Sequence, residues 1–291
     1  MIELRHHDVE IAGPRDTRVR LHVVEAGPKA GRLMLLLHGF PEFWKSWEKQ
    51  IEPLAAAGFR VLVPDQRGYN LSEKPPGVAS YDIDLLASDV VGLIRWAGHE
   101  RAILVGHDWG AAVAWHVALR YPEAVERLVI ANGPHPRALI RHFRKPAQLR
   151  RSWYIFGFQI PYLPELSLAS RDYRWLAGGM KATSRKGTFT REQLDEYKQA
   201  WAQPGALSSM LNWYRAVFRS PRRGMRTWQG TVKVPTTIIW GENDAFLGRS
   251  IADESARLCE SVRLERIAGA SHWVQHEEPD QVTRLILESA H

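Results

Sequence analysis

The stretch Gly106-His107-Asp108-Trp109-Gly110 follows the apolar run Ala102-Ile103-Leu104-Val105 and precedes an alanine-rich segment, residues 111–119. This pattern predicts a buried strand that turns sharply into a helix, with glycines beside the turn because side chains would clash there. The tip of such a turn is usually a serine, but here it is Asp108. A carboxylate attacks acyl carbons weakly and strained or activated alkyl carbons well, leaving an alkyl ester that water must hydrolyse. The stretch therefore favours hydrolysis at an sp³ carbon over an esterase or lipase reaction.

Strand and helix patterns alternate through the first half of the chain, which predicts βαβ units and a mainly parallel sheet. Strands are predicted at residues 3–11, 18–25, 33–37, 59–64, 102–106 and 127–131. Helices are predicted at residues 43–57, 82–97 and 109–121, the last ending before Pro122. The first two strands are expected to pair antiparallel around the turn Ala12-Gly13-Pro14.

The alternation stops after Asn132-Gly133-Pro134. From there to about Gly224 the sequence is rich in aromatic residues and prolines, with helical segments and no convincing strand. Strands resume at residues 235–240 and 262–267, and an amphipathic helix follows at 280–288. We therefore predict an α/β fold in which residues 1–133 and 225–291 form a core domain with an eight-stranded, mostly parallel sheet. Residues 134–224 are expected to form a helical cap inserted between strands six and seven.

The composition is that of an ordinary globular chain, with 45% hydrophobic and 24% charged residues over 291 positions. A single cysteine, Cys259, excludes an internal disulfide and favours a reducing compartment. Without a signal-peptide pattern or an apolar run of about 18 residues, we expect a cytoplasmic protein with no membrane insertion. The net charge of +7 is concentrated in residues 137–151 and 215–226. The favoured explanation of this charge is that it lies on solvated helix faces, and the alternative is a partner surface or attraction of anionic substrates. No nucleic-acid motif is present.

A second motif, Leu37-His38-Gly39-Phe40-Pro41, closes the third predicted strand. Gly39 permits an unusual backbone path, and the N–H of Phe40 can donate to an oxyanion. The N–H of Trp109, at the start of the helix after Asp108, is the second predicted donor. In isolation the motif is better explained as a strand-ending turn with a structural histidine. Its combination with the Asp108 turn favours the catalytic interpretation.

A histidine and an acid occupy the positions expected of a general base and its orienting partner. His272, after the last predicted strand, is expected to take a proton from the hydrolytic water. Asp244, after the seventh strand, is expected to orient His272 and stabilise its cationic form, with Glu242 as a nearby competitor. The sixth strand ends in Asn132 and not in an acid, which removes the obvious alternative. The histidines show no metal-ligand spacing, so neither a metal nor another cofactor is expected.

Together these residues resemble the epoxide hydrolases of the α/β-hydrolase fold. The resemblance runs along nearly the whole chain, from His38-Gly39-Phe40-Pro41-Glu42-Phe43-Trp44 through Pro64-Asp65-Gln66-Arg67-Gly68-Tyr69 and the Asp108 turn to His272-Trp273. It implies an enzyme that opens an epoxide with Asp108 and releases a vicinal diol by hydrolysing the ester. The aromatic side chains expected in the pocket wall imply a lipophilic or aromatic epoxide as substrate, and a monomer or homodimer is expected. The predicted pocket residues are His38, Phe43, Trp44 and Trp153.

Epoxide hydrolases of this kind use two cap tyrosines to donate hydrogen bonds to the epoxide oxygen. The segment Leu211-Asn212-Trp213-Tyr214-Arg215 is similar to the second of the family's cap motifs and makes Tyr214 one donor. Residues 153–161 align best with Tyr154 as the other donor, with Tyr162 and Tyr173 as alternatives. An uncharged phenol suits this role because it can donate without neutralising the nucleophile.

Two alternatives stay open. A haloalkane or haloacid dehalogenase with the same Asp-His-Asp triad is the nearer one. Haloalkane dehalogenases typically carry Asn at the position of Phe40, and fluoroacetate dehalogenases resemble D-R-x-x-R where this chain has Trp109 and Ala112. The alternative from another class is a ligand-binding receptor with a hydrolase fold and little turnover, against which the complete catalytic set argues.

Overall fold

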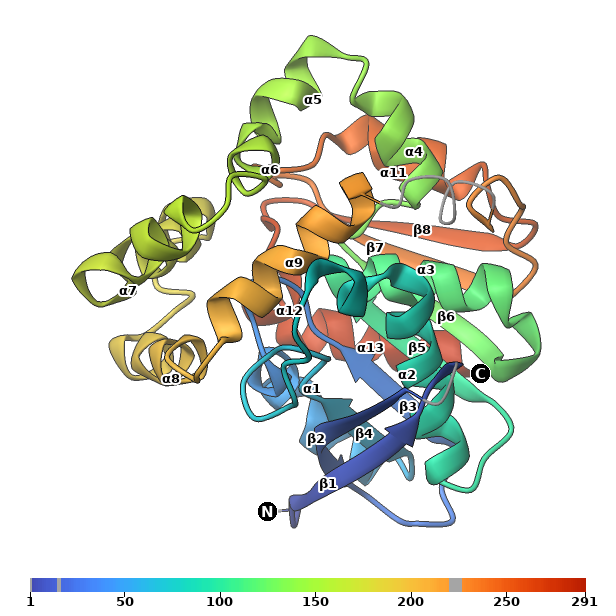
Figure 1. Ribbon diagram of the computed structural model, residues 1–291. Helices are drawn as coiled ribbons and strands as arrows, with labels where there is room; N and C mark the ends of the chain where they lie inside the picture. The colour runs from blue at the N-terminus through green and yellow to red at the C-terminus, as the bar shows by residue number, and fades with distance from the viewer. Residues whose placement is uncertain (1, 15–16, 220–226) are drawn as a thin grey trace.

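The computed structural model describes residues 2–14, 17–219 and 227–291. Its centre is an eight-stranded sheet in the order β1-β2-β4-β3-β5-β6-β7-β8 (Figure 1). The strands are β1 (Arg5–Ala12), β2 (Arg18–Ala26), β3 (Leu33–Leu37), β4 (Arg60–Pro64), β5 (Ala102–His107), β6 (Val125–Ala131), β7 (Thr236–Gly241) and β8 (Val262–Ile267). β2 pairs antiparallel with β1 and β4, and every other neighbouring pair is parallel. The predicted sheet is confirmed, with each strand end within two residues of its expected place.

The central strands carry continuous apolar runs because both faces of the sheet are covered. Every residue of β3 and β5 is buried. Helix α1 (Glu48–Ala56) packs with α13 (Pro279–Ala290), and α2 (Ile83–Trp96) packs with α3 (Trp109–Arg120). Helices therefore lie on both sides of the sheet (Figure 1), as the βαβ alternation predicts.

Local sequence signals set the helix ends. The Asp82 carboxylate accepts the N–H of Asp84 at 3.0 Å and caps the start of α2. Helix α3 ends at Arg120, followed by the 3₁₀ turn Pro122–Ala124. The helix predicted at residues 43–57 is divided into a 3₁₀ turn, Trp44–Trp47, and α1. A further 3₁₀ turn, Val78–Tyr81, precedes α2.

Between β6 and β7 the chain is helical. The segment forms α4 (Pro136–His142), α5 (Pro146–Arg151), α6 (Trp153–Gly157), α7 (Leu163–Thr183), α8 (Arg191–Trp201) and α9 (Ala206–Arg219), and residues 134–219 contain no strand. The remaining helices are α11 (Arg249–Ala256) and α12 (Val274–Glu277). The insertion predicted between strands six and seven is confirmed, whereas its predicted end at residue 224 lies outside the described residues. Of the helices described, none is long and apolar enough to cross a membrane.

Candidate active site

Five loops at one edge of the sheet bring the predicted site residues together. β3, β5, β6, β7 and β8 are consecutive parallel neighbours, so their carboxyl ends meet at the same edge. The residues that follow these strands are Phe40, Asp108, Asn132, Asp244 and His272. Helices of the insertion lie over this edge (Figure 1).

Asp108 stands between β5 and α3 in a conformation that non-glycine residues rarely adopt, with φ 50° and ψ −116°. The turn is tight enough that a Cβ on Gly110 would lie 2.2 Å from the Leu37 carbonyl oxygen. A Cβ on Gly39 would lie 2.4 Å from the Asp108 Cβ. Close backbone approach therefore explains both glycines. The strained turn places the Asp108 carboxylate at the wall of two cavities.

The N–H of Phe40 donates to Asp108 Oδ1 at 2.9 Å. One carboxylate oxygen is thus held by the backbone, while this N–H leaves Oδ2 unbonded. The N–H of Trp109 is the first of α3 and has no partner within the helix. Its part in an oxyanion hole stays a prediction.

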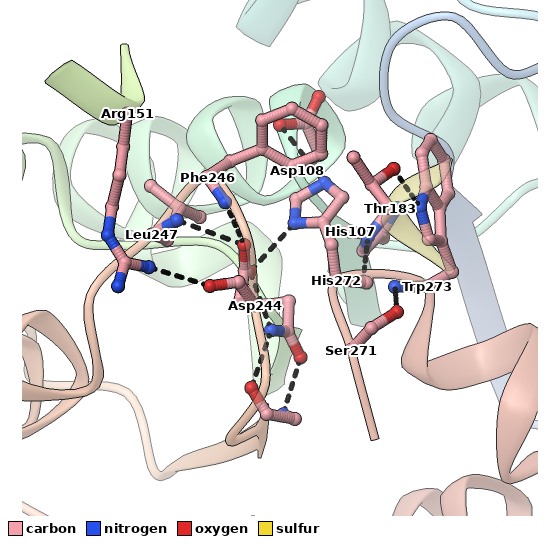
Figure 2. Close-up of polar contacts among 12 residues, drawn as sticks. His107, Asp108, Arg151, Thr183, Asp244, Phe246, Leu247, Ser271, His272 and Trp273 are labelled. Carbon is pink, nitrogen blue, oxygen red and sulfur yellow. Dashed lines mark hydrogen bonds and ion pairs between the residues drawn. The ribbon is translucent and has the colours of Figure 1, made fainter. Parts of the chain in front are cut away.

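His272 and Asp244 form a buried pair beside Asp108 (Figure 2). The distance from His272 Nδ1 to Asp244 Oδ2 is 2.8 Å. Asn132 Nδ2 also donates to Asp244 Oδ2 at 2.8 Å. The N–H groups of Phe246 and Leu247 donate to Oδ1 at 2.7 and 2.9 Å. This set of donors fixes the Asp244 carboxylate toward His272.

Burial opposes ionisation of Asp244, but the adjacent His272 and the donors on both oxygens lower its pKa below the ordinary value. Glu242, the competing acid, lies 3.8 Å from Arg266 and takes no part in this arrangement. Asp244 is therefore the carboxylate positioned to orient the histidine.

Burial also opposes the charged form of His272, but the carboxylate of Asp244 and then that of Asp108 raise its pKa to about 9. The imidazole is consequently protonated in the resting site at neutral pH. His272 Nε2 lies 3.7 Å from Asp108 Oδ2, an ion-pair distance that is too long for a hydrogen bond. Asp108 Oδ2 is thus close to the histidine without being hydrogen-bonded to it.

The phenols of Tyr154 and Tyr214 lie in the same cavity as Asp108. Their ring centroids are 6.3 Å apart. The Tyr214 ring packs edge-on against Trp109 and Phe40, at 5.0 and 5.3 Å. Burial, reinforced by the charge of Asp108, raises the pKa of each phenol above its ordinary value. Both side chains therefore keep their protons and can donate them in hydrogen bonds.

The alternative tyrosines lie elsewhere. Tyr162 is 80% exposed, and Tyr173 packs against Trp201 at 5.9 Å. Neither lines a cavity that reaches Asp108. Of the four candidate phenols, Tyr154 and Tyr214 are thus the two that line the same cavities as Asp108.

Two cavities meet at Asp108. The larger, of about 880 Å³, also reaches His272, and the smaller, of about 130 Å³, extends toward α4. Asp108, Tyr154, Tyr214 and Phe246 line both. Most of the remaining wall is apolar, so Asp108 and the two phenols are the main polar groups that line both cavities.

Three of the four predicted pocket residues are corrected by the structure, because His38, Phe43 and Trp44 line neither cavity. His38 is fully buried, and its Nε2 accepts the N–H of Gln66 at 3.0 Å, which places it under the Phe40 loop. Phe43 packs against Tyr197 at 5.1 Å, and Trp44 against His6 at 5.7 Å. Trp153 lines the larger cavity as predicted, although it is 71% exposed.

Sequence reasoning missed two contributors. Phe246 packs against His272 at 5.0 Å and against Tyr154 of the cap at 5.7 Å. Only its position two residues after Asp244 could have indicated this role. The sequence indicates only that Asn132 is not an acid. In the structure its side chain donates to Asp244 and accepts a hydrogen bond from the N–H of Gly241 at 2.7 Å.

A buried polar cluster behind His272 was also missed. His107 Nε2 lies 2.9 Å from the His272 carbonyl oxygen, and His107 Nδ1 lies 2.8 Å from Glu42 Oε2. His276 contacts the other Glu42 oxygen at 2.7 Å. The cluster contacts the backbone of the His272 loop, and none of its three side chains lines either cavity. Within the described ranges, no group of three or more His, Cys, Asp and Glu side chains could hold a metal ion.

Comparison with known proteins agrees with this geometry. Residues 32–279 match the family model of the alpha/beta hydrolase fold. The chain is 48% identical to the AB hydrolase superfamily protein YfhM of Bacillus subtilis, over 93% of this chain and 94% of the relative. It is 38% identical to human epoxide hydrolase 4, over 94% of this chain and 76% of the relative. A crystal structure of an epoxide hydrolase from Bacillus megaterium, in complex with an inhibitor, superimposes with a TM-score of 0.85 at 32% identity, covering 98% and 99% of the two chains. The chain belongs to the α/β-hydrolase fold family and, within it, to the epoxide hydrolases.

Proposed function

We propose that this protein hydrolyses an epoxide to a vicinal diol through a covalent ester on Asp108. The observation that carries the proposal is a pair of phenols, the half-buried Tyr154 and the buried Tyr214, in the same cavity as a strained carboxylate. An epoxide keeps its leaving oxygen tethered to the substrate, and that oxygen needs donors across the cavity from the nucleophile.

In the first step, Asp108 Oδ2 attacks a ring carbon while the two phenols donate to the epoxide oxygen. The C–O bond of the ring breaks as the new ester bond forms, and the alkoxide takes a proton from one phenol. The hydrogen bond from the Phe40 N–H to Oδ1 keeps the other carboxylate oxygen in place. Backside attack requires that the phenols hold the epoxide oxygen on the side of the substrate away from Asp108.

In the second step, water attacks the ester carbonyl carbon of Asp108, and His272 removes its proton. Esterification removes the negative charge of Asp108, which is one of the groups that raise the pKa of His272. The histidine therefore gives up its resting proton more easily once the ester has formed, and that proton restores the phenol that protonated the alkoxide. The Phe40 N–H, with Trp109 as the second predicted donor, stabilises the tetrahedral oxyanion. The intermediate collapses by breaking the bond between the acyl carbon and the substrate oxygen. That oxygen takes a proton from the new acid, which releases the vicinal diol and restores the Asp108 carboxylate, with His272 protonated again.

The proposed substrates are lipophilic or aromatic epoxides, since the walls of both cavities are mostly apolar. The smaller cavity has about the volume of an engineered cavity that binds benzene, roughly 150 Å³. A phenyl group or a short alkyl chain therefore fits on that side.

Three further expectations belong to this proposal. The core is formed by residues 1–133 and 225–291 and the cap by residues 134–224. The protein works in the cytoplasm, which the single cysteine, Cys259, favours. It acts as a monomer or homodimer on a small molecule and water.

Product analysis tests the reaction class. Wild-type protein is incubated with styrene oxide and, separately, with a 1-haloalkane. We expect diol from the epoxide and no halide release, and Asp108→Ala should abolish diol formation. Halide release without diol would identify a dehalogenase, and diol at a near-wild-type rate in Asp108→Ala would overturn the scheme.

A further inference from the structure

Large apolar side chains are exposed on one part of the insertion. Of the 14 large hydrophobic side chains that are exposed among the described residues, eight lie between residues 149 and 175. We call them the lid patch: Leu149, Trp153, Phe156, Ile160, Tyr162, Leu163, Leu166 and Trp175. They come from α5, α6, the loop after α6 and α7, which lie on the outer side of the insertion in Figure 1. Concentrated apolar exposure of this kind marks an interaction surface.

The positive charge of the protein is gathered in the same part of the chain. Residues 134–219 carry 15 lysines and arginines and five acidic residues, whereas the remaining residues carry 24 and 27. Near the lid patch in sequence are four exposed arginines, Arg144, Arg150, Arg171 and Arg174, which enter no ion pair among the described residues. The two acidic residues between positions 140 and 175, Glu165 and Asp172, are paired with Arg215 and Lys198.

The lid patch also borders the larger catalytic cavity. Trp153, Ile160, Leu163 and Trp175 line that cavity and are exposed at the same time. Arg150 lies among them. Because the same cavity reaches Asp108, an apolar path leads from the lid patch to the nucleophile.

We propose that the lid patch docks on the surface of an anionic lipid bilayer and that lipophilic epoxides enter the cavity from the bilayer. Aromatic and leucine side chains settle at the boundary of headgroups and acyl chains, and unpaired arginines are attracted to anionic headgroups. A second copy of the chain fits this surface less well, since a symmetric contact would bring the same positive charges face to face. Entry of substrate from the bilayer rests on the proposed function, whereas docking itself does not.

Vesicle flotation tests the docking. The purified protein is mixed with phosphatidylcholine vesicles, with and without phosphatidylglycerol, at low and high sodium chloride. We expect the protein to float with the anionic vesicles, to bind neutral vesicles weakly, and to lose binding as salt screens the arginines. The double variant R144Q/R174Q should bind anionic vesicles about 30-fold more weakly, at about fivefold per arginine. Leu166→Ser, which removes a side chain that is 70% exposed, should weaken binding roughly tenfold.

Matched controls carry the same changes at the other edge of the sheet. R95Q/R101Q removes two exposed arginines at the end of α2 and just before β5. Val262→Ser removes an exposed apolar side chain at the start of β8. Both controls should bind vesicles like the wild type. Turnover of dissolved styrene oxide should be unchanged in R144Q/R174Q and Leu166→Ser, because none of these residues lines either cavity.

Several results would overturn the docking proposal. One is the absence of flotation with anionic vesicles at low salt, and another is an equal loss of binding in the controls. A concentration-dependent dimer in light scattering that Leu166→Ser dissociates would assign the lid patch to a second copy of the chain. A wild type that floats but forms no diol would count against the proposed reaction and leave the docking in place.

Discussion

Replacing Tyr214 by phenylalanine isolates the contribution of one phenol to ring opening. The substitution removes the hydroxyl and keeps the ring, whose contacts with Trp109, Phe40 and Phe158 at 5.0, 5.3 and 5.1 Å are preserved. A hydrogen bond to a charged group contributes about 1.5–3 kcal/mol. Its loss should therefore slow formation of the Asp108 ester about 10- to 150-fold. Tyr154 still donates to the epoxide oxygen, so the reaction should be slowed and not abolished.

The assay separates the two steps under single-turnover conditions. Trp109 follows the nucleophile and packs against Tyr214, so stopped-flow tryptophan fluorescence is placed to report ester formation and decay. We expect slower formation with little change in decay, because the phenols face the epoxide oxygen and not the ester carbonyl. Tyr162→Phe, at a side chain that is 80% exposed, is the control and should behave like the wild type. Ester formation in Tyr214→Phe within about twofold of the wild type would refute the role given to Tyr214.

The remaining predictions concern stability and the geometry of the nucleophile. Because the pKa of His272 is raised from 6.5 to about 9, its stabilising contribution is complete below pH 6.5 and is lost as the pH rises through 9. In urea denaturation, the free energy of unfolding of the wild type should fall between pH 6.5 and 9 relative to that of His272→Gln. If the two free energies change in parallel with pH, the raised pKa of His272 is contradicted. Asn132→Ala removes one of the two partners of Asp244 Oδ2, where His272 remains, and leaves the Gly241 N–H without its buried acceptor. Urea denaturation should therefore show a loss of about 2 kcal/mol in the free energy of unfolding, and an unchanged free energy would show that these contacts are incidental. Gly39→Ala places a Cβ 2.4 Å from that of Asp108 and should reduce diol formation at least about 100-fold, as measured in product assays. Gly178→Ala, where a Cβ meets nothing within 4 Å, should keep full activity, and equal activity in the two variants would show that the Gly39 loop does not set the position of Asp108.

The fold was predictable from the sequence because its signals are local. The buried run Leu33–Leu37 and the glycine-flanked Asp108 turn each identify their element without reference to the rest of the chain. The positions of Asp244 and His272 were predictable because parallel strands end at one edge of the sheet.

Side-chain direction was not predictable in the same way. Phe43 and Trp44 lie close in sequence to the oxyanion loop, yet the 3₁₀ turn that begins at Trp44 points them toward Tyr197 and His6. Phe246 contacts His272 through a loop path that has no periodicity in sequence. The exposed residues of the lid patch follow from how α6 and α7 pack, which composition alone does not reveal.

Intact-protein mass spectrometry of His272→Gln incubated with styrene oxide tests the central claim most directly. Without its general base the enzyme should stall after ring opening. We predict a mass gain equal to the whole epoxide, with peptide mapping that places it on Asp108. Unmodified protein with undiminished diol formation, or an adduct on another residue, would contradict the covalent mechanism.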